Sequence, residues 1–274
     1  MQNGDPARSN LVIAPHLDDA VFSLGGLLIQ EPRNTKVITV FAGIPRTPVL
    51  RLWDRICGFH DSTRAVETRI QENDFALQSV GISKENSINL SYVDRQYRRP
   101  FLNLKGESAS TLTEIKKNVM SELRSLMEKE KAGTVRIFAP MLGAHQDHAI
   151  VRDAVMELHT ALQGTPARFE FYLYQDLPYF YVYYMRKLCD RLKSKKEVMQ
   201  NLEPEGVPGK RCVFELSEQE FLKKIEACKL YASQFHSKIF GFHSLFRQQR
   251  TISFDQAEIL KTKSRYCEVV YKIE

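Results

Sequence analysis

Two short clusters of histidine and aspartate contain the residue types that bind metal ions and transfer protons. The first is His16-Leu17-Asp18-Asp19, and the second is His145-Gln146-Asp147-His148. Imidazole nitrogens and a carboxylate oxygen are a common ligand set of catalytic zinc sites, where three protein ligands leave one position for water. The clusters hold six such side chains, more than one ion needs. The surplus fits metal-assisted hydrolysis, which also requires a base and groups that orient the ligands.

Each cluster directly follows a segment that the sequence predicts to be a buried strand. These segments are the apolar runs Leu11 to Pro15 and Val135 to Pro140. In an open α/β sheet, ligands bind beyond the carboxyl ends of the strands. We therefore expect the two clusters to meet at that edge of the sheet and to share one metal site.

Predicted strands and helices alternate through the first two thirds of the chain. The strands are expected at residues 11–15, 36–43, 87–90, 135–140 and 168–174, and the helices at 23–31, 62–80, 111–130 and 148–162. This alternation predicts an α/β fold with a Rossmann-like, doubly wound, mostly parallel sheet flanked by helices. The length of 274 residues, with 43% hydrophobic residues, fits one domain over residues 1–274.

The pattern is less regular beyond residue 175. Residues 176–212 are expected to form an aromatic-rich insertion or lid that ends in a loop rich in proline and glycine. Packing on the core and a substrate-binding wall are both open interpretations of this segment. A further helix is expected from Ser217, because Ser217 and Glu220 form a capping-box pattern.

The pair Gly25-Gly26 follows the first cluster. It lacks the spacing of a dinucleotide-binding loop and the lysine of a phosphate-binding loop. We interpret the pair as a tight turn that lets the first helix approach the metal-binding loop.

Composition excludes several classes of protein. Five scattered cysteines without a Cys-x-x-Cys pair argue against a disulfide scaffold and a cysteine zinc cluster. The formal net charge is +6, but the basic residues are interleaved with acidic ones. That pattern is typical of solvated helix faces, so no nucleic-acid partner is expected, and an anionic substrate or membrane surface is the alternative.

The polar N-terminus and the absence of a long apolar run favour a cytoplasmic protein without a transmembrane segment. The sequence indicates nothing about the oligomeric state.

In this order the two clusters resemble the signature motifs of the LmbE-like deacetylases, relatives of the N-acetylglucosaminyl-phosphatidylinositol (GlcNAc-PI) de-N-acetylase, PIG-L. The usual forms of these motifs are His-Pro-Asp-Asp-Glu and His-x-Asp-His. The resemblance extends to Gly25-Gly26, Arg69-x-x-Glu72, Asp94 and Tyr231-x-Ser233-Gln234, so it spans most of the chain.

The resemblance implies a role for each polar residue of the clusters. Three residues would bind a zinc ion, or another divalent first-row metal: His16, Asp19 and His148. Asp18 would act as the general base on the attacking water. This division suits the chemistry, because adjacent aspartates seldom both reach one ion. His145 would face the developing oxyanion and later protonate the leaving nitrogen, while Asp147 would orient a histidine.

The resemblance also implies contacts to the substrate outside the two clusters. Arg69 would hold polar or anionic groups, and Asp94 would accept hydrogen bonds from sugar-like hydroxyls. An arginine on a helix surface and an aspartate in a turn are the alternative interpretations of these two residues.

Three positions depart from the usual motifs. Leu17 replaces a proline, Ala20 replaces a glutamate, and Gly143 stands where some of these deacetylases carry a tyrosine. None of the three is an expected ligand or proton-transfer residue, so the departures bear on the substrate. Tyr231, or one of the tyrosines at positions 179, 181, 183 and 184, is a candidate to replace the missing phenol.

We therefore expect a zinc-dependent amide hydrolase that removes an N-acetyl or other N-acyl group. Its partner would be a small N-acylated substrate, an amino sugar or another hydroxylated metabolite. A metal-dependent hydrolase of an ester or cyclic amide is the first alternative. The second alternative is a non-catalytic protein that binds a membrane surface or nucleic acid, which the complete set of ligands and base disfavours.

Overall fold

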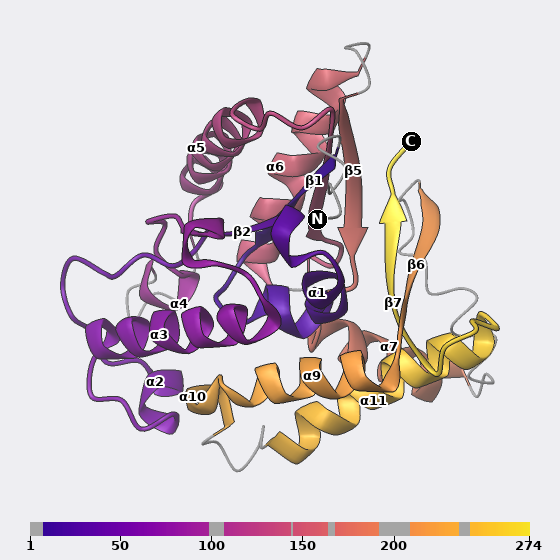
Figure 1. The fold of residues 1–274 in the computed structure, drawn as a ribbon. Helices are drawn as coiled ribbons and strands as arrows, with labels where there is room; N and C mark the ends of the chain where they lie inside the picture. The colour runs from indigo at the N-terminus through magenta and orange to yellow at the C-terminus, as the bar shows by residue number, and fades with distance from the viewer. Residues whose placement is uncertain (1–7, 99–106, 144, 164–167, 192–208, 236–241) are drawn as a thin grey trace.

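The computed structural model describes residues 8–98, 107–143, 145–163, 168–191, 209–235 and 242–274. Within these ranges, seven strands form one open sheet with the order β3-β2-β1-β4-β5-β7-β6 (Figure 1). The strands are β1 (Arg8–Ala14), β2 (Thr35–Thr39), β3 (Ser87–Asn89), β4 (Thr134–Pro140), β5 (Phe169–Tyr174), β6 (Lys210–Leu216) and β7 (Tyr266–Lys272).

The first five strands of the sheet are parallel, whereas β7 runs antiparallel to both β5 and β6. Central strand β1 pairs with β2 on one side and with β4 on the other, so that Val12 lies beside both Val37 and Phe138. The strand order therefore reverses between β1 and β4. In such sheets, a crevice opens at this point beyond the carboxyl ends of the strands. The predicted α/β class with a doubly wound, mostly parallel sheet is confirmed.

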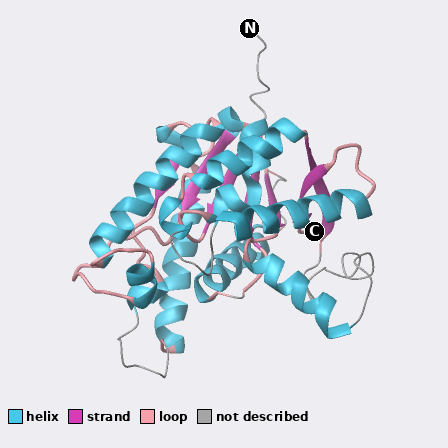
Figure 2. Cartoon of the chain, turned by 90° about the horizontal axis from the view of Figure 1, so that it is seen from below, coloured by secondary structure: helices cyan, strands magenta, loops and turns pink. Residues whose placement is uncertain are grey.

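Helices cover both faces of the sheet (Figures 1 and 2). The helices α1, α3 and α9 pack against one another on one face, and α5 packs on α6 on the other. The described helices are α1 (Asp19–Gln30), α2 (Leu52–Ile56), α3 (Ser62–Val80), α4 (Arg95–Arg98), α5 (Ala109–Glu128), α6 (Gln146–Leu162), α7 (Tyr179–Arg191), α9 (Glu218–Lys229), α10 (Ala232–Phe235) and α11 (Phe242–Ile259), with 3₁₀ turns η1 (Pro32–Asn34) and η2 (Lys84–Asn86). None of the described helices is long and apolar enough to cross a membrane.

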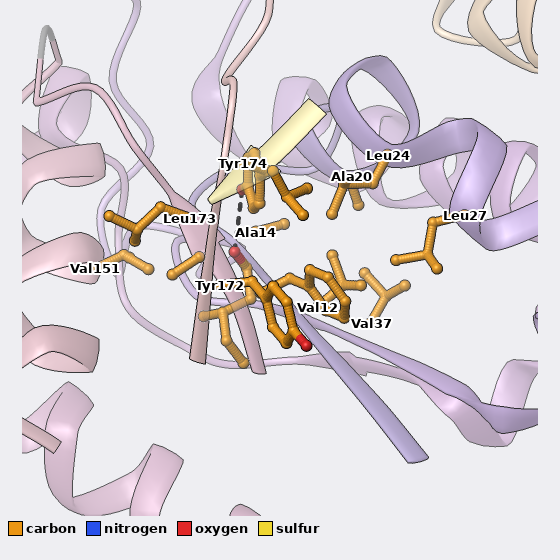
Figure 3. Close-up of a cluster of buried hydrophobic side chains, with 14 of the residues drawn as sticks. Val12, Ala14, Ala20, Leu24, Leu27, Val37, Val151, Tyr172, Leu173 and Tyr174 are labelled. Atoms are coloured by element: carbon orange, nitrogen blue, oxygen red, sulfur yellow. Dashed lines mark hydrogen bonds between the residues drawn. The ribbon is translucent and has the colours of Figure 1, made fainter. Parts of the chain in front are cut away.

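The central strands are buried on both faces, which explains their nearly continuous apolar sequences. Figure 3 shows Leu24 and Leu27 of α1 on one side of the sheet and Val151 of α6 on the other. Tyr174, at the end of β5, donates a hydrogen bond from its hydroxyl to the carbonyl of Ile13 at 3.1 Å. This contact ties the end of β5 to the end of β1, the strand that leads into the first cluster.

Three elements differ from the sequence predictions. α1 begins at Asp19 rather than near residue 23, so Gly25-Gly26 lies inside the helix and the predicted tight turn is wrong. The aromatic segment after residue 178 is a helix, α7, while the predicted loop at 201–210 falls almost wholly outside the described residues. The C-terminal pair β6–β7 extends the sheet beyond the predicted strands, and helix α11 packs on β7.

Candidate active site

The two clusters lie together at the carboxyl edge of the sheet. His16 lies in the turn between β1 and α1, and Asp19 is the first residue of α1. His145 caps the N-terminus of α6, and Asp147 and His148 lie in the first turn of that helix. The reversal of strand order between β1 and β4 thus brings residues about 130 positions apart in the sequence into contact, as shown by the 3.3 Å between His16 Nε2 and Asp147 Oδ2.

Three of these side chains lie close enough together to be candidate ligands of one metal ion. Asp19 Oδ2 lies 3.2 Å from His148 Nε2 and 3.4 Å from His16 Nδ1. One ligand atom from each residue lies within 4.8 Å of the others. The backbone also fixes the Asp19 carboxylate, because the same Oδ2 accepts a hydrogen bond from the His16 amide at 2.8 Å. Two imidazoles and a carboxylate are a donor set that zinc favours.

The hydrogen bonds of His148 indicate which of its nitrogens faces the ion. Its Nδ1 lies 2.8 Å from Asp176 Oδ2, and Asp176 Oδ1 accepts from the Leu142 amide at 2.9 Å. Its Nε2 is buried at ion-pair distance, 3.2 Å, from Asp19 Oδ2, and it has no further hydrogen-bond partner among the described residues. A histidine whose Nδ1 is held by a carboxylate, and whose buried Nε2 faces a second carboxylate, has the arrangement of a metal ligand. The sequence analysis did not select Asp176, although its position just after β5 places it at the same edge.

His16 is held in a similar way from the opposite side. Its Nε2 contacts Asp147, so its Nδ1 is the nitrogen that faces Asp19. Asp147 is itself fixed by Arg98, whose Nη2 donates to Oδ1 at 2.6 Å, and by the Arg95 amide, which donates to Oδ2 at 2.9 Å. The structure thus provides the contact that the expected orienting role of Asp147 requires. Arg98 was not selected from the sequence, because nothing in its local pattern distinguishes it from a surface arginine.

The electrostatics of this group favour positive charge. Burial would lower the pKa of His16, but hydrogen bonds to Asp147 and Asp19 raise it above its usual value. For His148, burial is likewise outweighed by the Asp19 charge and by Asp176, which raise its pKa to about 9. Burial would raise the pKa of Asp19, but His148 holds it well below its usual range. The residues therefore fit a divalent cation, which would replace the histidine protons between the same donors.

Asp18 and His145 neighbour the three candidate ligands, and their pKa values are shifted in opposite directions. Asp18 occupies the N-cap position of α1, yet its side chain makes no capping hydrogen bond. Burial and the neighbouring Asp19 charge raise the pKa of Asp18 to about 6. Burial and the charge of His16 lower the pKa of His145 to about 4. The His145 Nδ1 accepts from the Asp147 amide at 3.3 Å, so the neutral ring carries its proton on Nε2.

Arg69 and Asp94 lie at different depths. Asp94 is at the site, with Oδ2 3.8 Å from His16 Nε2, and its side chain is 23% exposed. Arg69 is buried, pairs with Asp54 at 2.8 Å and donates to the Tyr97 hydroxyl at 3.0 Å. Its burial is inconsistent with the alternative of a surface arginine. Arg69 therefore binds Tyr97 on α4, three residues after Asp94, and not the histidines and aspartates of the two clusters.

One tyrosine of the aromatic segment borders the clusters. The Tyr179 ring, at the start of α7, is 4.9 Å from the His148 ring and 6.2 Å from the His145 ring. Tyr231, another candidate for the missing phenol, is buried and donates its hydroxyl to Asn73 at 2.8 Å. The start of the 176–212 segment therefore lies beside the two histidines, whereas Tyr231 packs within the core.

A family model supports the assignment suggested by this geometry. Residues 11–159 match the family described as PIG-L, GlcNAc-PI de-N-acetylase. The chain belongs to this family. The matched region contains both clusters together with Arg69 and Asp94, and it ends before Asp176 and Tyr179. No curated protein matches the sequence.

Solved structures of deacetylases share the fold over nearly the whole chain. A deacetylase of teicoplanin biosynthesis has a TM-score of 0.75 at 23% identity, covering 98% of each chain, and one of its structures is described as a zinc-inhibited form. The A40926 pseudoaglycone deacetylase has a TM-score of 0.69 at 23% identity, covering 97% of each chain. The N,N'-diacetylchitobiose deacetylase of Pyrococcus horikoshii has a TM-score of 0.57 at 18% identity, covering 97% of this chain and 84% of its own.

Proposed function

We propose that this PIG-L family member is a zinc-dependent hydrolase that removes an N-acyl group from a linear amide. The observation that carries the proposal is the position of His148 Nε2, which is buried 3.2 Å from Asp19 Oδ2 and has no further hydrogen-bond partner among the described residues. Family membership supports the reaction class, because the description of the family names a de-N-acetylase. His16, Asp19 and His148 would hold the ion. When bound, zinc lowers the pKa of a water molecule and polarises the amide carbonyl.

Asp18 and His145 supply the two proton transfers that amide hydrolysis needs. The uncapped carboxylate of Asp18 takes a proton from the attacking water. His145 donates a hydrogen bond from its neutral Nε2–H to the carbonyl oxygen as negative charge develops there. As the C–N bond breaks, His145 gives its Nε2 proton to the leaving nitrogen, and the proton that Asp18 took from water restores His145, so both residues return to their starting states. Water and amide thereby become a carboxylic acid and an amine.

The substrate that this site suits is a hydroxylated N-acyl compound, such as an N-acetylated amino sugar. Asp94 is partly exposed beside His16, where its carboxylate can accept hydrogen bonds from hydroxyls. Tyr179 offers a flat apolar surface beside the two histidines, against which a sugar face or acyl chain can pack. This class is supported by deacetylases with this fold whose descriptions name teicoplanin, the A40926 pseudoaglycone and N,N'-diacetylchitobiose.

The proposal is tested with purified protein that has been stripped by a chelator and reloaded with one equivalent of zinc. A panel of N-acetylated amino sugars, simple N-acetyl amines and matched acetate esters is assayed for released amine and acetate. We expect amide hydrolysis that chelation abolishes and zinc restores. Zinc-loaded protein that cleaves none of the amides would overturn the deacylase function, and cleavage of esters alone would favour the alternative hydrolase.

A further inference from the structure

The helix that carries Asp19 is broken within its second turn. Leu24 has φ −125° and ψ 23°, outside the helical range, although α1 continues to Gln30. The break separates a first segment, residues 19–23, from a second segment, residues 25–30. Because two helical segments meet at a kink there, contacts from outside the helix can set the direction of the segment that carries Asp19.

Side chains from the C-terminal third of the chain occupy both sides of this break. An unbroken helix would pair the Gly26 amide with the Phe22 carbonyl. Here the Gly26 amide donates to Glu268 Oε1 at 2.8 Å, and the Phe22 carbonyl accepts from Gln249 Nε2 at 2.7 Å. The Leu27 amide donates to the second oxygen of Glu268 at 3.1 Å. Glu268 on β7 thus binds two consecutive amides of α1 directly after the break.

Glu268 is held in this position by a buried lysine. Lys224 Nζ on α9 lies 2.7 Å from Glu268 Oε1, and the residues are 2% and 5% exposed, respectively. A buried charge is stable only when it is paired and hydrogen-bonded, so each member of this pair depends on the other. The same carboxylate therefore receives the lysine ammonium and the two amides of α1.

The Gly25-Gly26 pair makes room for these contacts. A Cβ atom on Gly25 would lie 2.6 Å from Lys224 Cγ, and one on Gly26 would collide with Leu216 and lie 2.9 Å from Glu268 Oε2. The glycines are therefore needed for the close approach of α9 and β7 to α1, rather than for a turn.

The first segment of α1 is also tied to the partner of His148. Ser23 Oγ accepts from the Leu177 amide at 3.1 Å, and Leu177 follows Asp176 directly. At its other end, the segment starts with the carboxylate of Asp19, 3.2 Å from His148 Nε2. A rotation of residues 19–23 would change both contacts at once.

We propose that Glu268 and Lys224 are positioning residues, which hold the break in α1 and thereby set how Asp18 and Asp19 face the metal. The inference rests on the proposed metal site. Neither residue contacts the metal-binding side chains, and both lie outside the region matched by the family model. Their influence passes through the backbone of α1 from Gly26 to Asp19.

The test replaces zinc with Co²⁺, whose visible absorption bands report the arrangement of its ligands. Glu268→Gln is expected to shift these bands and to weaken Co²⁺ binding by about tenfold, the lower range for loss of an orienting partner. Wild-type bands and affinity in this variant would overturn the proposal. The measurement needs no substrate, so it does not depend on which acyl compound the protein hydrolyses.

A matched control removes a carboxylate charge at the other end of the same helix. Glu31 follows α1 directly, and its Oε2 accepts from Arg136 Nη2. Glu31→Gln should lower the thermal midpoint without moving the Co²⁺ bands, because its contacts lie far along the helix from Asp19. Equal band shifts in the two variants would mean that the bands follow stability alone, and would overturn the positioning role.

A second variant covers the case in which Glu268→Gln does not fold. The double variant Lys224→Met/Glu268→Gln buries no unpaired charge, yet its single amide oxygen replaces the two carboxylate oxygens that serve Gly26 and Leu27. It should fold and show shifted bands, and unshifted bands would contradict the proposal. Wild-type protein that binds no Co²⁺ would overturn the metal site itself. Amide hydrolysis by wild type with unshifted variant bands would overturn only the positioning role.

Discussion

Asp18 and Asp19 are neighbours in the sequence but meet different surroundings. Asp19 lies against His148 and His16, which lower its pKa, whereas burial raises the pKa of Asp18 to about 6. One carboxylate therefore stays ionised beside the histidines, while the other makes no capping contact and is free to exchange a proton. Because the helix begins between them, the adjacent pair suits the proposed division into a ligand and a base.

Replacing Asp18 separates these two roles. We expect Asp18→Asn to keep about one equivalent of metal and to lower kcat by roughly 10²-fold or more, the scale for loss of a positioned general base. Metal analysis and steady-state kinetics on the same preparation provide the measurement. A parallel loss of metal and activity would instead make Asp18 a ligand.

In the proposed metal site, Asp176 would act on the ion through His148. Asp176→Asn replaces the charged acceptor of His148 Nδ1, so we expect metal affinity to fall by about 10- to 100-fold in a chelator competition. Asp54→Asn is the matched control, because Asp54 is a buried carboxylate that pairs with Arg69 instead. Comparable losses of affinity in both variants would remove the specific role of Asp176.

We expect Asp94 to contribute to substrate recognition. Asp94→Ala should lower kcat/KM for a hydroxylated N-acetyl substrate more than for a simple N-acetyl amine, because only the first loses a hydrogen-bond acceptor. The two substrates are compared in the same zinc-loaded preparation. Equal losses on both would exclude Asp94 from hydroxyl recognition.

At the scale of elements, local signals predicted the parallel strands and their helices well. α3 spans the predicted residues 62–80, and Gly81 ends it with φ 101°. The capping box of Ser217 and Glu220 is present at the start of α9. These features depend on residues close in the sequence. The antiparallel strands β6 and β7 were missed, because their pairing depends on partners that no local pattern reveals.

The start of α1 shows how tertiary contacts override local patterns. The glycine pair predicted a turn, yet Glu268, 242 residues from Gly26, binds the amides there and lets the helix continue past its break. The site follows the same division. Both clusters were apparent from residue types, whereas Asp176 and Arg98 emerge only from contacts across 28 and 49 residues.

The packing around the glycine pair yields a stability prediction for this element. Gly26→Ala should destabilise the protein by about 1–3 kcal/mol, because the added Cβ would collide with Leu216 and crowd Glu268. Urea unfolding measures the change. Gln71→Ala, at an exposed position of α3, is the control and should stay within about 0.5 kcal/mol of wild type. A neutral Gly26→Ala would show that the contact relaxes freely.

At the scale of the whole molecule, the chain combines two parts of one sheet. The family-matched region, residues 11–159, carries both clusters. The remaining C-terminal part supplies Asp176, Tyr179 and the side chains around the break in α1. The site therefore depends on the full sheet, which agrees with the nearly complete overlap with deacetylase structures. The reaction itself follows from the side chains at the sheet edge, since one fold can support several chemistries.

The most direct test of the central claim is the zinc content of His148→Ala compared with wild type. Purified proteins are loaded with excess zinc, dialysed against metal-free buffer and analysed for bound metal. We expect about one equivalent in wild type and a large loss in His148→Ala, because the buried Nε2 would be one of three ligands. His159→Ala, which removes a histidine at the far end of α6, should retain the full equivalent. Full zinc content in His148→Ala would contradict the ligand assignment on which the proposed reaction depends.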